Sequence, residues 1–176
     1  MTTSHRVRPV TVDDVSAVKE LALDNKMFEP DEMDAFDEML TGYLEGALEG
    51  HVWEVAVDDV GAVLGAVYYA PEPFADRVWN LYFIAVSPSQ HRDGVGHTLI
   101  DHVEGQLRRR GDGVARVLIV ETSSLAGYDN ARAFYAKRGY DEEARIRDFY
   151  GPGDAKVVFW KSLVDTTSDR RTLRAW

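Results

Sequence analysis

The feature that most constrains this chain is a junction in its middle, where an apolar stretch passes through a turn into a helical pattern. Residues 79–86 are aromatic, branched or apolar at almost every position, which is typical of a central, buried strand. Pro88 ends that strand, and Gly94 and Gly96 follow it. From Gly94 onward apolar residues recur every four positions, so we expect a helix over residues 94–110. A buried strand therefore leads through a short turn directly into a helix.

Such a junction is well suited to binding an anion. The first backbone N–H groups of a helix have no partner within the helix, and the helix dipole makes this end positive. Gly94 and Gly96 carry no side chain, so the backbone can approach a ligand closely, and Arg92 adds a charged contact. The Walker-type pattern is absent, and Leu99 stands where a dinucleotide fold needs a third glycine. The junction is therefore expected to bind a diphosphate, although Gly-x-Gly alone is also compatible with an ordinary helix start.

Hydrophobic periodicity and turn residues predict the other elements. Their order implies an α/β chain whose mixed central sheet has helices on both faces. We expect one domain over residues 1–164 and a loose polar tail over 165–176. The predicted strands cover residues 7–10, 51–57, 62–70, 79–86, 116–120, 143–150 and 156–160. Apart from the helix at 94–110, the predicted helices run from an N-cap at Thr11 to about Asp24, from Asp31 to about Glu49 with Gly50 as its stop, and from a cap at Asp129 or Asn130 to Gly139.

Charge narrows the classes of partner. The net charge of −10 argues against nucleic acid, which usually requires a basic surface. The charge is also uneven, because residues 27–76 hold thirteen acidic residues and no lysine or arginine. This acidic segment is more typical of a solvated surface that aids solubility, and it is also compatible with attraction of a cationic substrate.

The remaining composition excludes several kinds of site and of protein. The chain has no cysteine, which rules out disulfides, thiolate metal sites and a cysteine nucleophile. His97 and His102 are five residues apart, not the three or four that place two ligands on one helix face, so no metal is expected. No apolar run approaches the roughly 20 residues of a membrane helix, and the N-terminal residues lack a signal-peptide pattern. A soluble cytoplasmic protein with no membrane partner is the expectation.

Two motifs resemble those of the GNAT N-acetyltransferase superfamily. The first is Val86-x-Pro88-x-x-His91-x-x-Gly94-x-Gly96, which is similar to the family's (Gln/Arg)-x-x-Gly-x-(Gly/Ala) turn, with His91 where glutamine or arginine is usual. The second is residues 130–140, Asn-Ala-Arg-Ala-Phe-Tyr-Ala-Lys-Arg-Gly-Tyr, which resembles the later helix of the family. The resemblance implies a GNAT-like acyl-CoA N-acyltransferase fold, with acetyl-CoA as co-substrate and its pyrophosphate held by the main chain of the turn.

The resemblance also implies which residues contact the cofactor. The acyl-pantetheine would pair with the end of the central strand, the diphosphate would lie at the turn, and the later helix would add contacts. The residues implied are Ile84, Ala85, Val86, His91, Arg92, Asp93, Gly94, Val95, Gly96, His97, Thr98, Asn130, Phe134 and Tyr135.

Amide formation from a thioester needs an oxyanion donor, a proton acceptor for the amine and a proton donor for the thiolate. By resemblance, Tyr135 is the proton donor and the backbone N–H of Val86 or its neighbour is the oxyanion donor; Tyr135 is otherwise a core tyrosine. Some relatives place a glutamate as proton acceptor where this chain has Asn80. Because an asparagine cannot act as a base, Glu121 is the best substitute. Glu121 could equally cap a loop or helix, and a water chain would also serve. Without a cysteine, direct attack in a ternary complex is expected.

The acceptor would lie against aromatic and apolar residues, namely Phe28, Met33, Phe36 and Tyr150, each of which also suits an ordinary core or surface position. The predicted activity is transfer of an acetyl group from acetyl-CoA to a primary amine of a small molecule or peptide. The resemblance also makes a homodimer possible, because members of that family are often dimers. The alternatives are an acyl-CoA-binding sensor without catalysis and a scaffold with an empty turn.

Overall fold

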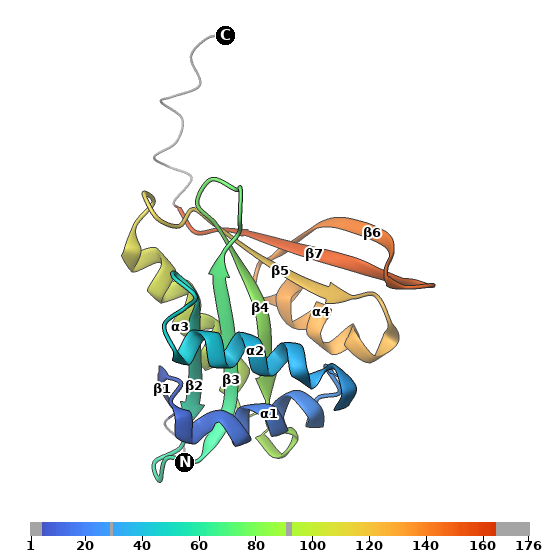
Figure 1. The fold of residues 1–176 in the computed structure, drawn as a ribbon. Coiled ribbons are helices and arrows are strands. Elements are labelled where there is room, and N and C mark those ends of the chain that lie inside the picture. The colour runs from blue at the N-terminus through green and yellow to red at the C-terminus, as the bar shows by residue number, and fades with distance from the viewer. Residues whose placement is uncertain (1–4, 29, 91–92, 165–176) are drawn as a thin grey trace. The chain divides into compact units, whose positions relative to one another are not determined.

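The computed structural model describes residues 5–28, 30–90 and 93–164 (Figure 1). Within these residues the chain forms seven strands and four α-helices in the predicted order, which confirms the order of elements. The elements are β1 (Arg6–Pro9), α1 (Val15–Asp24), α2 (Met33–Leu44), β2 (Val52–Val57), β3 (Val63–Pro71), β4 (Val78–Val86), α3 (Val95–Arg110), β5 (Val117–Ser123), α4 (Asp129–Lys137), β6 (Asp141–Gly151) and β7 (Asp154–Ser162). The predicted loose tail over 165–176 lies outside the described residues.

The strands form one mixed sheet in the order β1-β2-β3-β4-β5-β7-β6, as predicted. Contacts divide the chain into two compact parts, one made of Met1–Pro71 and Leu81–Gly105 and the other of Glu72–Asn80 and Gln106–Trp176. They are called the first part and the second part below, and each is described by itself. The single domain expected over residues 1–164 remains a prediction.

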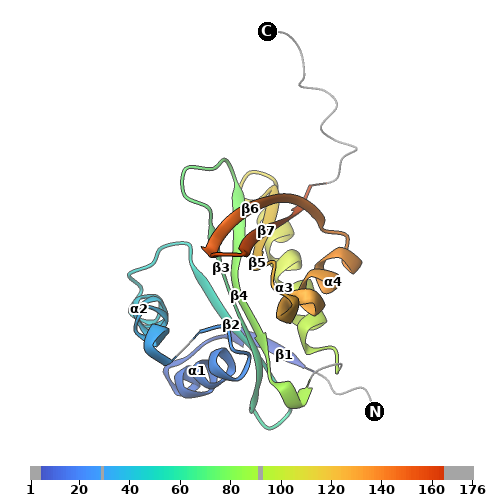
Figure 2. The ribbon, with the colours of Figure 1, turned by 90° about the vertical axis from the view of Figure 1, so that its right-hand side faces the viewer.

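In the first part, helices cover both faces of the strands, as Figure 2 shows for α1 and α2 on one side and α3 on the other. Neighbouring residues of a strand point to opposite faces. The Trp53 ring on β2 lies 5.4 Å from the ring of Phe36 on α2, whereas the Glu54 carboxylate accepts a hydrogen bond from His102 on α3 at 3.0 Å. The predicted arrangement of helices on both faces is therefore confirmed for this part. Its main core lies under α1 and α2.

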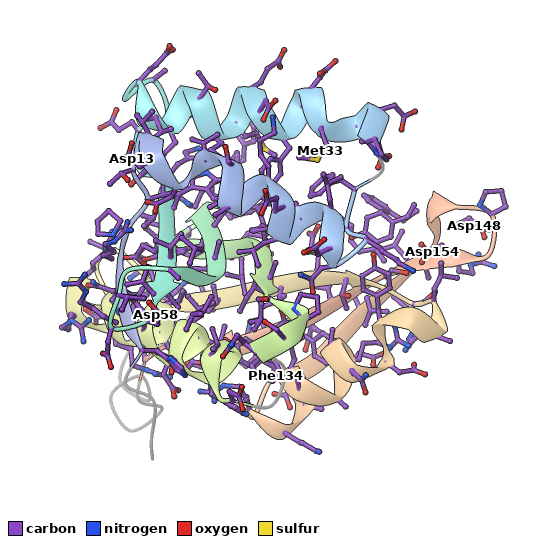
Figure 3. All side chains as sticks on the ribbon, turned by 90° about the horizontal axis from the view of Figure 1, so that it is seen from below. Asp13, Met33, Asp58, Phe134, Asp148 and Asp154 are labelled. Carbon is purple, nitrogen blue, oxygen red and sulfur yellow. The ribbon has the colours of Figure 1, made fainter. Side chains whose placement is uncertain are left out.

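The second part contains an antiparallel group of strands and helix α4. Strand β7 pairs with β5 on one side and with β6 on the other. The ring of Tyr135 on α4 lies 5.5 Å from that of Phe159 on β7, which packs the helix on one face of these strands. Strand β6 is an edge, and its pairing with β7 is interrupted between Ile146 and Gly151. Asp148 and Asp154 lie at this end of the hairpin (Figure 3).

The predicted end of the second helix is wrong. Helix α2 ends at Leu44, not near Glu49, and Gly46 rather than Gly50 stops it. The Gly46 N–H donates to the Tyr43 carbonyl at 2.9 Å, and the Ala47 N–H donates to the Gly42 carbonyl at 2.8 Å. With Gly46 at φ +74°, this is the Schellman pattern of a helix C-terminus. Gly50 also has a positive φ, but it lies in the connection to β2.

Two predicted helix caps also differ from the structure. Thr11 caps a 3-10 turn over Val12–Asp14, which leads into α1, so it does not cap the α-helix itself. Tyr128, not Asp129 or Asn130, is the N-cap of α4. A 3-10 turn precedes this helix as well, at Ala126–Tyr128. In both cases the turn moves the start of the α-helix beyond the residue that the pattern favours.

Candidate active site

The turn before α3 has the geometry that binds anions. Gly94 has φ +83°, a conformation that favours glycine, and the space where a side chain would stand is open. Its carbonyl accepts from the Thr98 N–H at 2.9 Å, which starts the helix. No described residue accepts from the N–H groups of Val95 or Gly96. These two donors lie at the positive end of the helix, where a phosphate group would bind.

Most predicted cofactor residues lie on this turn or beside it, in the first part. Ile84, Ala85 and Val86 form the last residues of β4; Ala85 is buried, while its two neighbours are half-buried. After the turn, Asp93 and His97 are exposed and Thr98 is half-buried. His91 and Arg92, also predicted here, lie outside the described residues.

Tyr135 lies in the second part, on the inner face of α4. Its ring is buried and contacts the rings of Phe134, Tyr140 and Phe159. Burial raises the pKa of its phenol far above the ordinary value, so the hydroxyl stays protonated at neutral pH. The hydroxyl makes no hydrogen bond with a described residue, although buried tyrosine hydroxyls usually have a partner. Its chemistry is that of a proton donor.

Glu121, the predicted proton acceptor, is held by a lysine in the second part. Its Oε2 lies 2.8 Å from Nζ of Lys156, and the exposed fractions of the two side chains are 28% and 13%. The same ammonium lies 3.7 Å from the centre of the Phe149 ring. Among the described residues, its partner is thus a lysine side chain and not the end of a loop or helix. Its charge is balanced by Lys156, a residue that the sequence analysis missed.

Tyr150 lies near the same carboxylate. Burial, together with the negative charges of Glu121 and Asp154 and the nearby phenol of Tyr128, raises the pKa of Tyr150 to about 12. The side chain is about half exposed. The phenol is therefore an exposed hydrogen-bond donor at neutral pH in an acidic environment, which suits contact with a polar acceptor molecule.

The two remaining residues predicted on α4 differ in exposure. Asn130 is exposed on the first turn of the helix. Phe134 is half-buried, and its ring lies 5.4 Å from that of Tyr135. Tyr135, Asn130, Phe134, Glu121 and Tyr150 all belong to the second part.

The other predicted acceptor residues belong to the first part. Phe36 is completely buried and Met33 is nearly so, so both serve the core under α1 and α2. Phe28 is half-buried and lies edge-on to Phe36, with ring centres 5.3 Å apart. Of these three, only Phe28 is partly exposed.

Asn80 occupies the position at which some relatives carry a glutamate. It is 1% exposed, and its Nδ2 donates to Oε2 of Glu72 at 3.1 Å. The amide side chain cannot accept a proton at neutral pH, so the carboxylate of the pair is that of Glu72. Sequence reasoning missed this pairing.

Within the described ranges, no group of three or more histidine, aspartate or glutamate side chains is arranged to hold a metal ion. Across those same ranges, no helix is both long and apolar enough to span a bilayer.

Comparison with known structures identifies the fold. A Desulfovibrio desulfuricans protein assigned to the GNAT family of acetyltransferases is 28% identical, with a TM-score of 0.81 over 92% of this chain and 100% of its own. The Escherichia coli ribosomal-protein-S18-alanine N-acetyltransferase is 18% identical, with a TM-score of 0.72 over 94% and 98%. The Salmonella typhimurium protein yncA, solved with acetyl-CoA, is 17% identical, with a TM-score of 0.73 over 93% and 96%. No curated protein matches the chain significantly.

The family model of the acetyltransferase (GNAT) family matches residues 16–140. This span includes α1, the turn before α3, strand β5 and helix α4, and so covers both motifs on which the resemblance rests. The chain belongs to the GNAT family of acetyltransferases.

Proposed function

We propose that this protein transfers the acetyl group of acetyl-CoA to a primary amine of a small molecule or peptide. The turn before α3 carries the proposal. Its N–H groups at Val95 and Gly96 have no acceptor among the described residues, and the open space at Gly94 admits a bulky anion. These features fit the diphosphate of a coenzyme A ester, and the family match over residues 16–140 supports that choice of anion.

Bound acetyl-CoA would supply an activated thioester. In the proposed reaction the ammonium first loses one proton to give the neutral amine. The amine nitrogen then forms a bond to the acetyl carbon, the carbon–sulfur bond breaks, and the nitrogen loses a second proton, which balances the proton gained by the thiolate and restores the phenol of the donor. We assign to Tyr135 the donation of a proton to the departing thiolate, because its phenol is protonated at neutral pH. The backbone N–H of Val86 or its neighbour is assigned to the thioester oxygen.

The proton acceptor is assigned to Glu121, directly or through water. The carboxylate is paired with Lys156 at 2.8 Å, which orients it before an amine arrives. Deprotonating an alkyl ammonium, with its pKa of about 10, requires such an acceptor.

The acceptor class is proposed to be a cationic amine. Acidic residues of the α2 region, among them Asp31, Asp34 and Glu38, are exposed, and no lysine or arginine lies between residues 27 and 76. An acidic surface raises the local concentration of cations. Among proteins of the same fold, one acts on an alanine of a ribosomal protein and another on an aminoglycoside, as their names state.

The test is a panel of primary amines incubated with acetyl-CoA, with release of free thiol as the readout. Polyamines, aminoglycosides, amino acids and peptide N-termini should include at least one substrate whose product is the N-acetyl amine. Coenzyme A alone should raise the melting temperature, since a ligand that binds only the folded state stabilises it. Melting-temperature stabilisation without turnover on any amine would favour the acyl-CoA sensor. The absence of both effects would overturn the proposal.

A further inference from the structure

One side chain far away in sequence holds the start of the proposed cofactor turn. Asn25 is the C-cap residue of α1. Its Nδ2 donates to the Leu21 carbonyl at 2.8 Å and to the Val86 carbonyl at 3.0 Å. An amide nitrogen carries two hydrogens, so both donors of this side chain are used. One bond closes the end of a helix, and the other crosses 61 residues to the end of β4.

The peptide unit after Val86 is held at both of its edges. The Val86 carbonyl accepts from Asn25, and the Ser87 N–H on the same peptide donates to the Leu64 carbonyl on β3 at 2.8 Å. A peptide unit is planar, so two bonds on opposite edges set the orientation of the whole plane. This peptide is the point at which β4 becomes the turn.

The backbone that carries Asn25 is itself in a defined, strained conformation. Lys26 has φ +52°, a region that a residue with a side chain rarely adopts. Its N–H donates to the Leu23 carbonyl at 2.9 Å, and the Met27 N–H donates to the Ala22 carbonyl at 3.1 Å. The chain thus makes a Schellman turn with lysine where glycine is usual. Such strain persists where surrounding contacts over-determine it, and the Asn25–Val86 bond is one of those contacts.

We infer that Asn25 is a positioning residue for the acetyl-CoA turn. By orienting the Val86–Ser87 peptide, it sets the direction in which the chain leaves β4 and so the place of Gly94 and the first N–H groups of α3. Asn25 contacts neither the coenzyme nor a reacting atom in this scheme. The inference rests on the proposed function, because the turn matters only if it binds the coenzyme.

The decisive variant is Asn25→Asp, which preserves the shape of the side chain. It removes both N–H donors and directs a carboxylate at two carbonyl oxygens. We expect the Kd for coenzyme A, measured by calorimetry well below the melting temperature, to rise about tenfold. The KM for acetyl-CoA should rise by a similar factor. Asn25→Ala removes the donors without adding charge and should give a smaller rise, so it serves if the aspartate variant fails to fold.

Lys19→Ala is the matched control on the same helix. Lys19 pairs with Asp37 of α2 at 2.6 Å, so its loss disturbs α1 without touching β4. It should leave the Kd for coenzyme A within twofold of the wild type. If the Asn25 variants melt at a lower temperature but bind coenzyme A like the wild type, Asn25 only caps α1 and the inference is overturned. Wild-type protein that does not bind coenzyme A would instead overturn the proposed function, and the inference with it.

Discussion

At the residue scale, Asp14 joins the start of α1 to strand β1. The carboxylate is 5% exposed. It accepts from Arg8 through Nη1 at 2.6 Å and Nη2 at 2.9 Å, and from the N–H and hydroxyl of Thr11 at 2.8 and 2.9 Å. The Arg8 guanidinium is the main cause that lowers the pKa of Asp14 to about 2. The ionised form is therefore stabilised by folding.

Asp14→Asn should lower the free energy of unfolding at neutral pH by about 2 kcal/mol. The pKa of the wild-type carboxyl is lower in the folded state, so its contribution is complete above about pH 4 and disappears as the pH falls toward 2. Urea unfolding of the wild type and the variant between pH 7 and pH 2 measures the difference between their free energies of unfolding. This difference should shrink as the pH falls below 4, and a difference independent of pH would contradict the assignment.

Tyr135→Phe tests the proposed proton donor. The hydroxyl has no hydrogen bond with a described residue, so its removal leaves no described partner unpaired and should change stability by less than about 1 kcal/mol. We expect kcat to fall about 100-fold or more, as for loss of a general acid, with the Kd for coenzyme A within twofold. Tyr140→Phe alters a neighbouring buried ring and should retain activity. Full activity in the Tyr135 variant would reduce this residue to a core role.

At the element scale, the two ends of α3 provide a matched pair of glycines. Gly94 before the helix and Gly111 after it have φ +83° and φ +84°, and both face open space. Backbone strain from a new side chain is therefore nearly equal at the two positions, while only Gly94 lies where the diphosphate is expected.

Gly94→Asp should abolish detectable binding of coenzyme A, because it places bulk and negative charge against the diphosphate. Gly111→Asp should keep the wild-type Kd, although an acidic residue at a helix C-terminus is unfavourable for the dipole and lowers stability somewhat. Calorimetry measures the Kd for coenzyme A of both variants. If the two variants bind with equal affinity, the turn is not part of the cofactor site.

Close packing of α3 against β3 and β4 depends on Gly65. A Cβ at this position would lie 2.9 Å from the Ala85 carbonyl oxygen and 3.1 Å from side-chain carbons of Leu99 and Val95. The carbonyl belongs to a strand and cannot move easily. Only glycine fits, and this fit brings the start of α3 close to the end of β4.

Gly65→Ala should therefore lower the free energy of unfolding by about 1–3 kcal/mol, as for overpacking in a core. It should also weaken binding of coenzyme A, since relief of the clash displaces the start of α3. Gly113→Ala is the control, because that glycine has open space and its substitution should change stability by less than about 0.5 kcal/mol. If denaturant unfolding gives the Gly65→Ala variant the same free energy of unfolding as the wild type, the packing relaxes without cost.

At the scale of the whole molecule, the net charge of −10 gives a test of the acceptor class. Raising the salt concentration from 0.1 M to 1 M shortens the Debye length from about 10 Å to about 3 Å. We expect the KM for a cationic triamine to rise several-fold over this range, while that for an amine without other positive charges changes less. Steady-state kinetics at fixed acetyl-CoA measures both. A KM for the triamine that is independent of salt would leave the acidic segment with solubility as its role.

Much of the fold was predictable because its signals are local. The aromatic, branched run before Val86 predicts a strand, the glycines after it predict the turn, and four-residue periodicity predicts α3; all three are present. The end of α2 was mispredicted because Gly46 and Gly50 give the same local signal, and only the bonds around Gly46 distinguish them. The position of the turn could likewise be predicted, because the backbone groups at a helix start are neighbours in sequence; its binding of an anion stays a prediction.

By itself, then, the sequence determined the order of elements, the turn and the family, because periodicity, turn chemistry and short motifs act between residues close along the chain. Tertiary structure alone decided that Asn25 holds Val86, that Lys156 balances Glu121, and that Gly65 must lack a side chain. Each of these depends on a distance of a few ångströms between residues widely separated in sequence. Hydrogen bonds, ion pairs and steric contacts act only at such distances, and the fold alone sets which residues reach them.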